Sequence, residues 1–486
     1  MVWVRTAKLA SLAAIFMVSC TPQAKIGAAS PSAPLPIVSI WTTSADGTRR
    51  LERGADLPLV AVGPASQGET VAVDPDRRYQ SMVGFGAAMT DASADLIENT
   101  LPPASRDRLI EELFGSDGLA IAFLRVPIGA SDFSARHYSL DDMPKGESDA
   151  ALSHFAFTRE TETQVAALLA ARAVNPQLAL MASPWSAPGW MKDSDSLIKG
   201  QLKPSAYPAF ADYFSRYIGE MAARGLPVGW ISVQNEPDFE PADYPGMRFQ
   251  PAARAQFIGQ YLGPMLEARG QTTKILDWDH NWDQPQNPLA VLANPDAARY
   301  VSGVAWHCYG GNVDAMGKVH AAYPDKDVFF TECSGGDWAP DWRQTLGWMT
   351  DNLIISATRF GSRGTLLWNL ALDERHGPHL GGCGDCRAVV TIDRANGTIT
   401  RNVEYYVLGH ASRFVKPGAR RIASSEGGSV PNAAFRNADG TLVLIAHNRA
   451  DRQVALTVAQ GGRSFQALLP AGEVATFVWR EEEKAP

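Results

Sequence analysis

The sequence has no run of lysine or arginine and no excess of positive charge. Its 44 basic and 52 acidic residues give a formal net charge of -8, and the two signs are mixed along the chain. Proteins that bind nucleic acid neutralise phosphates with clustered basic side chains. The composition therefore excludes nucleic acid as an expected partner, and it leaves the oligomeric state open.

Metal-binding patterns are also scarce. Cys383 and Cys386 have the spacing of half a zinc site, but no second Cys or His pair follows at matching spacing. The chain also lacks a His-x-x-x-His pair and an Asp-rich ligand cluster. We therefore expect no metal and no cofactor, and we predict a local disulfide between Cys383 and Cys386 in an oxidising compartment.

Long apolar runs are absent, and the N-terminal run is too short to span a bilayer permanently. Arg5 and Lys8 precede this run, which covers residues 9–18, and a cleavage-like segment ends at Cys20. We predict a lipoprotein-type signal peptide at 1–20 with lipid on Cys20, followed by a linker at 21–36. The alternative is cleavage nearby without a lipid. The expected location is periplasmic or on the cell surface, with the lipid in a bacterial outer membrane.

From residue 79 to 417, short β-branched or apolar runs alternate with longer amphipathic stretches. This alternation is typical of βα units on a parallel sheet. Eight units can be counted, which predicts an α/β fold with a (β/α)₈ TIM barrel. The predicted strands are 83–87, 120–126, 177–183, 228–234, 274–278, 303–307, 327–331 and 364–369, and the predicted helices include 159–174, 209–224, 252–269 and 342–359.

The chain changes character after residue 417. Short strand-like runs are punctuated by Gly, Asn and Asp, which indicates a β-sandwich over 418–482. Asp439 and Gly440 form a hairpin signal between two such runs. Similar runs at 37–41 and 70–73 lead us to assign 37–78 to the same side domain, built from both ends of the chain. The C-terminal predicted strands are 420–423, 441–448, 453–458, 464–469 and 474–479.

Two glutamates follow predicted barrel strands four and seven. Glu236 stands in Asn235-Glu236-Pro237, and Glu332 directly follows Thr331. Catalytic groups of a TIM barrel project from the carboxyl ends of its strands, so these two face each other across the barrel mouth. A glycosidase needs such a pair: one carboxylic acid protonates the leaving oxygen, and one carboxylate attacks the anomeric carbon. Asn235 is placed to bind a neighbouring sugar hydroxyl.

These features resemble glycoside hydrolase family 30, in particular its glucosylceramidase-like group. The similar motifs are 84–92, 124–127, 132–134, 183–188, 235–237, 307–309, 331–333 and 368–372. The resemblance implies that Glu236 is the acid/base and Glu332 the nucleophile of a retaining enzyme. It also implies that further residues hold the sugar or surround the nucleophile: Asp132, Trp185, Asn235, His307, Tyr309 and Trp368.

Some residues near the expected site are assigned other roles. We interpret Arg125 as holding a carboxylate, either Glu332 or Glu236, and Asp91 as structural. Residues 279–282 follow strand five and are candidates for lining the leaving-group side. His379 and Cys383 fall where the glucosylceramidase group has asparagines, so we expect a differently shaped loop at 373–387.

The expected activity is therefore retaining hydrolysis of a β-glucosyl bond in a glycolipid such as glucosylceramide, or in another β-glucoside. Two alternatives remain: a β-1,6-glucanase of the same family, and a non-catalytic sugar-binding protein. The second alternative is disfavoured because Glu236 and Glu332 are both present. The absence of ligand clusters disfavours a metal-dependent hydrolase.

Overall fold

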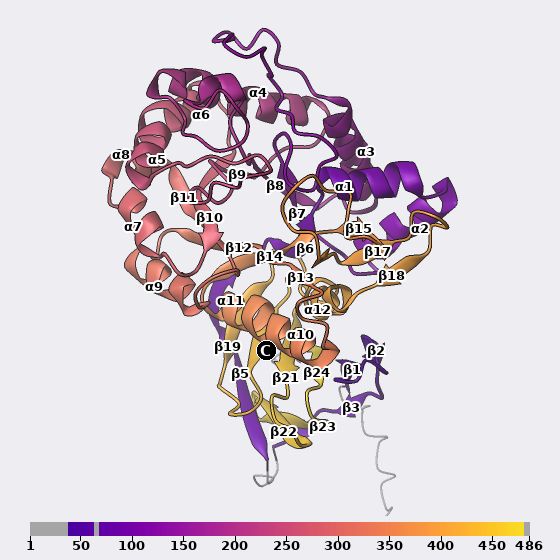
Figure 1. Ribbon diagram of the computed structural model, residues 1–486. Helices are drawn as coiled ribbons and strands as arrows, with labels where there is room; N and C mark the ends of the chain where they lie inside the picture. Colours follow the sequence, from indigo (N-terminus) through magenta and orange to yellow (C-terminus); the bar gives the residue numbers. More distant parts are fainter. Residues whose placement is uncertain (1–36, 63–67, 481–486) are drawn as a thin grey trace, which may run out of the picture. The chain divides into compact units, whose positions relative to one another are not determined.

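The computed structural model describes residues 37–62 and 68–480 (Figure 1). The predicted signal peptide, the linker and Cys20 lie outside these residues. Across the described ranges, no helix combines the length and the apolar character that a membrane crossing requires.

Eight parallel strands close into a barrel in the order β10-β11-β12-β14-β6-β7-β8-β9. These strands are β6 (Gly84–Ala88), β7 (Phe123–Pro127), β8 (Ala179–Ser183), β9 (Trp230–Ser232), β10 (Lys274–Asn281), β11 (Val301–His307), β12 (Asp327–Glu332) and β14 (Ser362–Asn369). Each overlaps one predicted strand, so the predicted TIM barrel is confirmed. Its strand ends supply the positions from which catalytic side chains project.

Helices lie around the outside of the barrel (Figure 1). They are α1 (Asp91–Asp95), α2 (Pro103–Phe114), α3 (Arg159–Val174), α4 (Tyr207–Ala223), α5 (Pro251–Phe257), α6 (Gly263–Ala268), α7 (Gln286–Leu292), α8 (Pro295–Tyr300), α9 (Asp314–Ala322), α10 (Trp342–Met349), α11 (Ala357–Arg359) and α12 (Val403–Ser412). The bounds of α3 match the prediction, and its N-cap is Thr158, whose side chain accepts a hydrogen bond from the Thr161 N–H.

Two predicted helices are interrupted by wider π-helical turns. The segment 252–269 contains α5, a π-helix at Ile258–Leu262 and α6, while 342–359 contains α10, a π-helix at Thr350–Ser356 and α11. In the first case Pro264 has no N–H to donate to the preceding turn, so a regular α-helical ladder cannot run through it.

Strands from both ends of the chain form the second domain, in the order β2-β1-β24-β21-β20-β19-β5-β22-β23-β4, with β3 paired to β1. Its strands are β1 (Ile37–Thr43), β2 (Glu52–Arg53), β3 (Leu57–Pro58), β4 (Val60–Ala61), β5 (Glu69–Ser81), β19 (Arg420–Ser424), β20 (Asn432–Arg436), β21 (Thr441–His447), β22 (Val454–Gln460), β23 (Arg463–Leu469) and β24 (Val474–Arg480). Because β1 pairs with β24 and β5 pairs with β19, the predicted side domain built from both chain ends is confirmed.

The long strand β5 joins two parts of this domain. Its first residues pair in parallel with β22, and the remainder pairs antiparallel with β19. The predicted hairpin at Asp439-Gly440 connects β20 to β21, and Gly440 adopts a φ of 80° there. Sequence analysis missed β20, whose residues Asn-Ala-Ala-Phe-Arg include no β-branched side chain.

Two small sheets beside the barrel were not predicted either. One pairs β13 (Gly335–Gly336) with β16 (Cys386–Arg387), and the other contains β15 (Ala371–Asp373), β17 (Val390–Ile392) and β18 (Ile399–Arg401). The first brings the loop at 373–387 next to the segment that follows β12.

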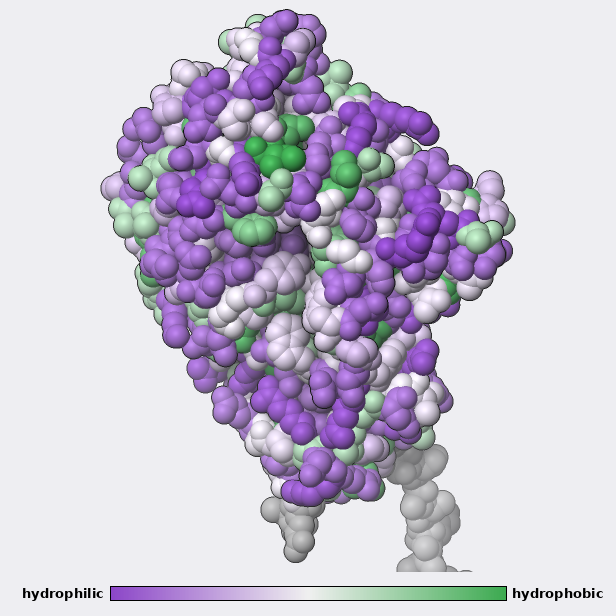
Figure 2. Space-filling view, viewed as in Figure 1, coloured by the Kyte–Doolittle hydropathy of each residue, from purple (hydrophilic) through white to green (hydrophobic). Residues whose placement is uncertain are grey.

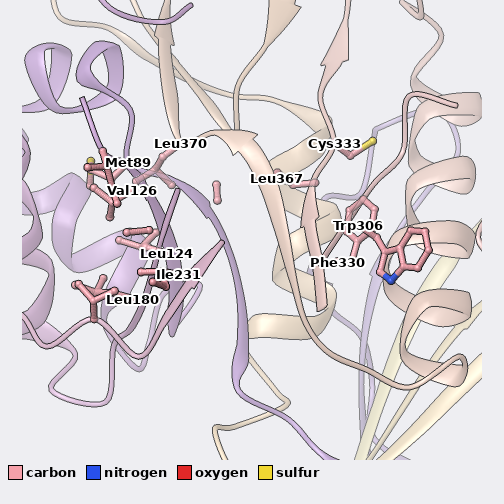
Figure 3. Packing of buried hydrophobic residues seen from close by; sticks show 14 of the residues in the cluster. Met89, Leu124, Val126, Leu180, Ile231, Trp306, Phe330, Cys333, Leu367 and Leu370 are labelled. Carbon is pink, nitrogen blue, oxygen red and sulfur yellow. The ribbon is translucent and has the colours of Figure 1, made fainter. Parts of the chain in front are cut away.

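Successive side chains on each barrel strand point alternately into two hydrophobic cores, one between the strands and the helices and one inside the barrel. Leu124, Leu180 and Ile231, from neighbouring strands, lie together in the cluster between the strands and the helices (Figure 3). Phe123 instead belongs to a small cluster inside the barrel. Since successive side chains of a strand point to opposite faces, Arg125 points into the barrel, as Phe123 does.

Candidate active site

Glu236 follows β9 in a strained conformation. Its φ is 48°, a region that residues other than glycine rarely adopt. The Glu236 N–H donates to the Asp279 carbonyl at 3.1 Å, and the N–H of Asn235 donates to the Pro184 carbonyl at 2.8 Å. These bonds from neighbouring strand ends hold the turn and aim the Glu236 side chain at the barrel mouth. Such strain is often found at functional sites.

Glu332 is the last residue of β12, and it is buried. Its Oε1 accepts a hydrogen bond from the Tyr309 hydroxyl at 2.9 Å, and its Oε2 pairs with the guanidinium of Arg125. The structure thus agrees with the interpretation that Arg125 holds Glu332. Arg125 also donates to Asn235 Oδ1 at 2.7 Å, so one guanidinium positions residues from two strand ends.

Asp279 lies beneath the two glutamates and is fully buried. It pairs with Arg125 at 2.7 Å and accepts a hydrogen bond from the Thr331 hydroxyl at 2.7 Å. It was predicted as a candidate for the leaving-group side, and that placement is wrong. The register between β10 and β11 shifts at Trp278, where φ is positive, so Asp279 turns into the barrel and Trp278 turns out toward the helices.

The other residues of the segment 279–282 also have structural contacts. His280 Nδ1 lies 3.4 Å from Glu236 Oε1, and Asn281 Oδ1 accepts a hydrogen bond from the Tyr309 N–H at 3.0 Å. Trp282 packs in the main hydrophobic core. These side chains therefore contact the residues of the site and do not line the cavity.

His307 connects the two glutamates with the buried aspartate. Its Nδ1 lies 3.1 Å from Glu236 Oε1, and its Nε2 lies 3.0 Å from Asp279 Oδ1 and 3.9 Å from Glu332 Oε2. Although burial opposes a charge on the ring, the carboxylates of Glu332, Asp279 and Glu236 raise the pKa of His307 to about 9. An imidazolium between the two glutamates is therefore the favoured state near neutral pH.

The pKa values of the two glutamates move in opposite directions. At Glu236 burial acts to raise the pKa, but hydrogen bonds from His280 and His307 outweigh it, and the pKa lies well below its usual range. At Glu332 burial dominates over the attraction of His307 and Arg125, and the pKa lies above its usual range. Both carboxyls and His307 interact closely, so they titrate as one set.

A cavity of about 440 Å³ opens above these groups, and the face shown in Figure 2 is hollowed over the barrel. Glu236 and Glu332 both line the cavity, together with five of the six residues that sequence analysis assigned to substrate: Asp132, Trp185, Asn235, Tyr309 and Trp368. His307, the sixth, is fully buried below it. The cavity is thus centred on the predicted carboxylate pair.

The inner wall of the cavity has stacked aromatic rings and a buried acid. Trp185 and Trp368 stack with ring centroids 4.9 Å apart, and Arg125 lies 4.7 Å from the Trp185 ring centroid. Burial and the neighbouring charges of Glu332 and Glu236 raise the pKa of Asp132 to about 8. Flat apolar faces beside polar groups suit a sugar ring with its hydroxyls.

Several lining residues were missed by sequence analysis. They are Phe239, Pro241, Ala242, Asp243, Tyr244, Trp338 and Gly382. They stand on loops, where no strand-end signal marks them. The adjacent glycines 381 and 382 are the one feature of the sequence that could have indicated this part of the wall. Gly382 has a φ of 69°, and a Cβ there would lie 2.5 Å from the Cβ of Asp132.

One disulfide lines the catalytic cavity, and a second lines a neighbouring cavity beside α10. Cys383–Cys386 confirms the predicted local bridge and forms part of the wall. Cys308–Cys333 was not predicted, and it joins the residues that follow His307 on β11 and Glu332 on β12. The structure also agrees with a structural role for Asp91, which accepts hydrogen bonds from Ser134 and Tyr138 at 2.6 and 3.0 Å.

One cluster of side chains has a spacing that would suit a cation. The ligand atoms of Glu236, His280 and His307 lie within 4.8 Å of one another. The same arrangement supplies Glu236 with two neighbouring imidazoles as proton donors. A cation site and a pair of proton-donating imidazoles predict different responses to a chelator.

The sequence and the structure are similar to those of known proteins over most of their length. The glycosyl hydrolase family 30 TIM-barrel domain matches residues 82–415, and the glycosyl hydrolase family 30 beta sandwich domain matches residues 418–477. An endo-1,6-β-D-glucanase of Neurospora crassa is 32% identical over 460 residues, which cover 90% of this chain and 94% of that protein. The mouse lysosomal acid glucosylceramidase is 28% identical over 481 residues, which cover 92% of this chain and 91% of that protein. A solved endo-β-1,6-glucanase superposes with a TM-score of 0.85 at 32% identity, covering 92% of this chain and all of that one.

Proposed function

Because the chain belongs to glycosyl hydrolase family 30, we propose that it hydrolyses β-1,6-linked glucan with retention of configuration. It is a glycosidase of that family. The observation that carries the proposal is the pair Glu236 and Glu332, which stand at two strand ends and line one cavity. Similarity to the Neurospora and the solved endo-β-1,6-glucanases supports the choice of substrate.

In the proposed mechanism, Glu332 attacks the anomeric carbon while the bond from that carbon to the leaving oxygen breaks. Glu236 gives its proton to the leaving oxygen, and a covalent glycosyl-enzyme results. Glu236 then takes a proton from water, which displaces Glu332 and releases the sugar. Both carboxylates lie beside one imidazole, at 3.1 Å from His307 Nδ1 for Glu236 and at 3.9 Å from His307 Nε2 for Glu332.

His307 is proposed to hold the proton that Glu236 delivers. In the free site the proton lies on His307, 3.1 Å from Glu236 Oε1. A bound sugar removes water from Glu236 and disfavours its charged form. The proton then passes from Nδ1 to Oε1, which leaves a neutral imidazole and a protonated acid. Arg125 and the Tyr309 hydroxyl keep Glu332 in place for attack.

A second candidate is removal of a single β-glucosyl unit from glucosylceramide. Similarity to the mouse glucosylceramidase favours it, as do the buried Asp132 and stacked tryptophans, which would enclose one terminal sugar. Purified protein should be assayed side by side on β-1,6-glucan, glucosylceramide and a chromogenic β-glucoside. We expect the highest specificity constant on β-1,6-glucan, and the reverse order would support the second candidate.

The stereochemistry has a separate test. Proton NMR of the first sugar released from a β-glucoside should show the β-anomer, because two displacements at one carbon restore its configuration. Initial α-anomer would mean inversion and would remove Glu332 from the role of nucleophile.

We also propose that the protein is exported and held at a bacterial outer membrane by a lipid on Cys20. The proposal depends on the basic residues Arg5 and Lys8, the short apolar run and the position of Cys20. Cys20→Ser should release the protein into the soluble fraction. Continued sedimentation of this variant with membranes would contradict the anchor.

A further inference from the structure

Three cavities follow one another from the catalytic glutamates to the sandwich domain. The catalytic cavity shares Tyr309 and Trp338 with a second cavity of about 450 Å³ beside α10. The second cavity shares Gln344 and Trp348 with a third, of about 510 Å³, which reaches residues of the sandwich domain. Because neighbouring cavities share side chains, the three lie next to one another, and we refer to them together as the trough.

Large aromatic side chains mark the trough at intervals. Three aromatic side chains are unusually exposed for their type: Tyr309 by 46%, Trp338 by 54% and Trp348 by 46%. Residues of intermediate hydropathy, drawn in pale colours, lie beside and below the hollow in Figure 2. Exposed rings beside a catalytic cavity offer flat surfaces on which successive sugar units stack.

The far end of the trough is polar and firmly built. The sandwich residues His447 and Arg449 both bind Asp351 of the barrel, at 2.9 and 2.7 Å. The exposed side chains of Asp341 and Arg343 also line this third cavity. Such groups bind hydroxyls well, whereas an alkyl chain would remove water from them without replacing its hydrogen bonds, which is unfavourable. The lining therefore favours a carbohydrate over the lipid portion of a glycolipid.

We propose that this trough is an extended binding track for a β-glucan chain, with Trp348 as a stacking platform and the sandwich domain contributing its distal end. The track holds sugar units beyond the two that flank the cleaved bond. The inference rests on the proposed function, because it names the polymer on which the catalytic pair acts. It assigns the sandwich domain a part in substrate binding in addition to its structural role.

The test compares short and long substrates with variants along the track. Trp348→Ala should lower kcat/KM on long β-1,6-gluco-oligosaccharides and on the polymer by roughly tenfold. The same variant should leave a chromogenic β-glucoside unaffected, since that substrate ends at the catalytic cavity. Trp348→Tyr should recover most of the loss, and Arg343→Ala should weaken only the longest substrates. Leu169→Ala, which removes an exposed apolar side chain on α3, is the matched control.

Each outcome decides the matter. A wild-type protein that cleaves the polymer while Trp348→Ala cleaves it equally well overturns the track and leaves the proposed function standing. Equal losses on the chromogenic glucoside and on the polymer also overturn it, because they indicate a general structural effect. A wild-type protein that does not cleave β-1,6-glucan overturns both. A loss confined to glucosylceramide would mean that the trough takes a lipid chain, which contradicts the proposal.

Discussion

At the scale of single residues, substitutions of the two glutamates should affect the reaction rate in different ways. Glu332→Gln should abolish turnover because an amide cannot form the glycosyl-enzyme. Glu236→Ala should lower kcat/KM by roughly 10²–10⁴-fold on substrates with poor leaving groups, where protonation matters most. Azide should restore the Glu236→Ala rate with an activated aryl glucoside and give a β-glucosyl azide. An α-azide product, or near-normal rates with a poor leaving group, would contradict the two roles.

The pH profile of kcat/KM should be bell-shaped, and its two sides report different groups. As the pH falls through the raised pKa of Glu332, the nucleophile becomes protonated and the rate falls. As the pH rises through about 9, the pair His307 and Glu236 loses its shared proton and the rate falls again. His307→Gln should therefore move the alkaline side to lower pH. An unchanged alkaline side in this variant would contradict the role of His307.

A chelator gives a further test at the cluster of Glu236, His280 and His307. If these residues serve as proton donors and acceptors, EDTA followed by dialysis should leave the activity on a chromogenic glucoside unchanged. Loss of activity that added zinc or another divalent cation restores would instead establish a metal site, and the proton route proposed for His307 would be wrong.

At the scale of elements, the loop that carries Gly382 should tolerate a side chain at this position poorly. Gly382→Ala places a Cβ against Asp132 in the wall of the cavity and also imposes a positive φ on alanine. Gly418→Ala has a similar φ of 82° with nothing within 4 Å of the added atom, so it is a matched control. Gly418→Ala should lose about 1–3 kcal/mol of stability from the backbone strain alone, and Gly382→Ala should lose more because of the added contact. Only Gly382→Ala should raise KM; equal KM values would show that the contact with Asp132 does not matter.

The elements also show what sequence alone can and cannot predict. The strands, their order and the catalytic pair follow from local patterns, because buried parallel strands are apolar and the site lies at their ends. Asp279 was misplaced because a bulge at Trp278 reverses which side chains face inward, and a strict alternation does not reveal such a bulge. Trp338 and Trp348 were missed because their importance comes from the packing of loops and α10 around a cavity. The bridge Cys308–Cys333 likewise depends on two strand ends that lie side by side only in the folded barrel.

At the scale of the whole molecule, the sandwich domain should stabilise the chain through its N-terminal strand. Ile40 is buried in the sandwich core, whereas Ile37 on the same strand is 57% exposed. Ile40→Ala should therefore cost about 2–5 kcal/mol of unfolding free energy. Ile37→Ala should cost less than about 0.5 kcal/mol. Denaturant unfolding of both variants measures the difference, and equal losses would mean that β1 does not belong to a cooperative core.

The pairing of β1 with β24 also affects the order in which parts of the chain can fold. β1 pairs locally with β2 and β3, but Ser39 lies opposite Val478, so the edge of β1 that pairs with β24 has no partner until residue 478 has been synthesised. Contacts this distant in sequence form slowly, because a very long loop must close before they contribute. The barrel can begin to fold while one edge of β1 is still unpaired, and an exposed strand edge is the kind of surface that aggregates or recruits chaperones. His410 of α12 bonds both Thr43 of β1 and Thr476 of β24, at 2.8 and 2.9 Å, so the pairing of these two strands also joins the sandwich to the barrel. The sandwich is therefore completed only when β24 joins β1, and a chain truncated shortly before residue 474 would leave this edge of β1 open and would be degraded more readily by proteases.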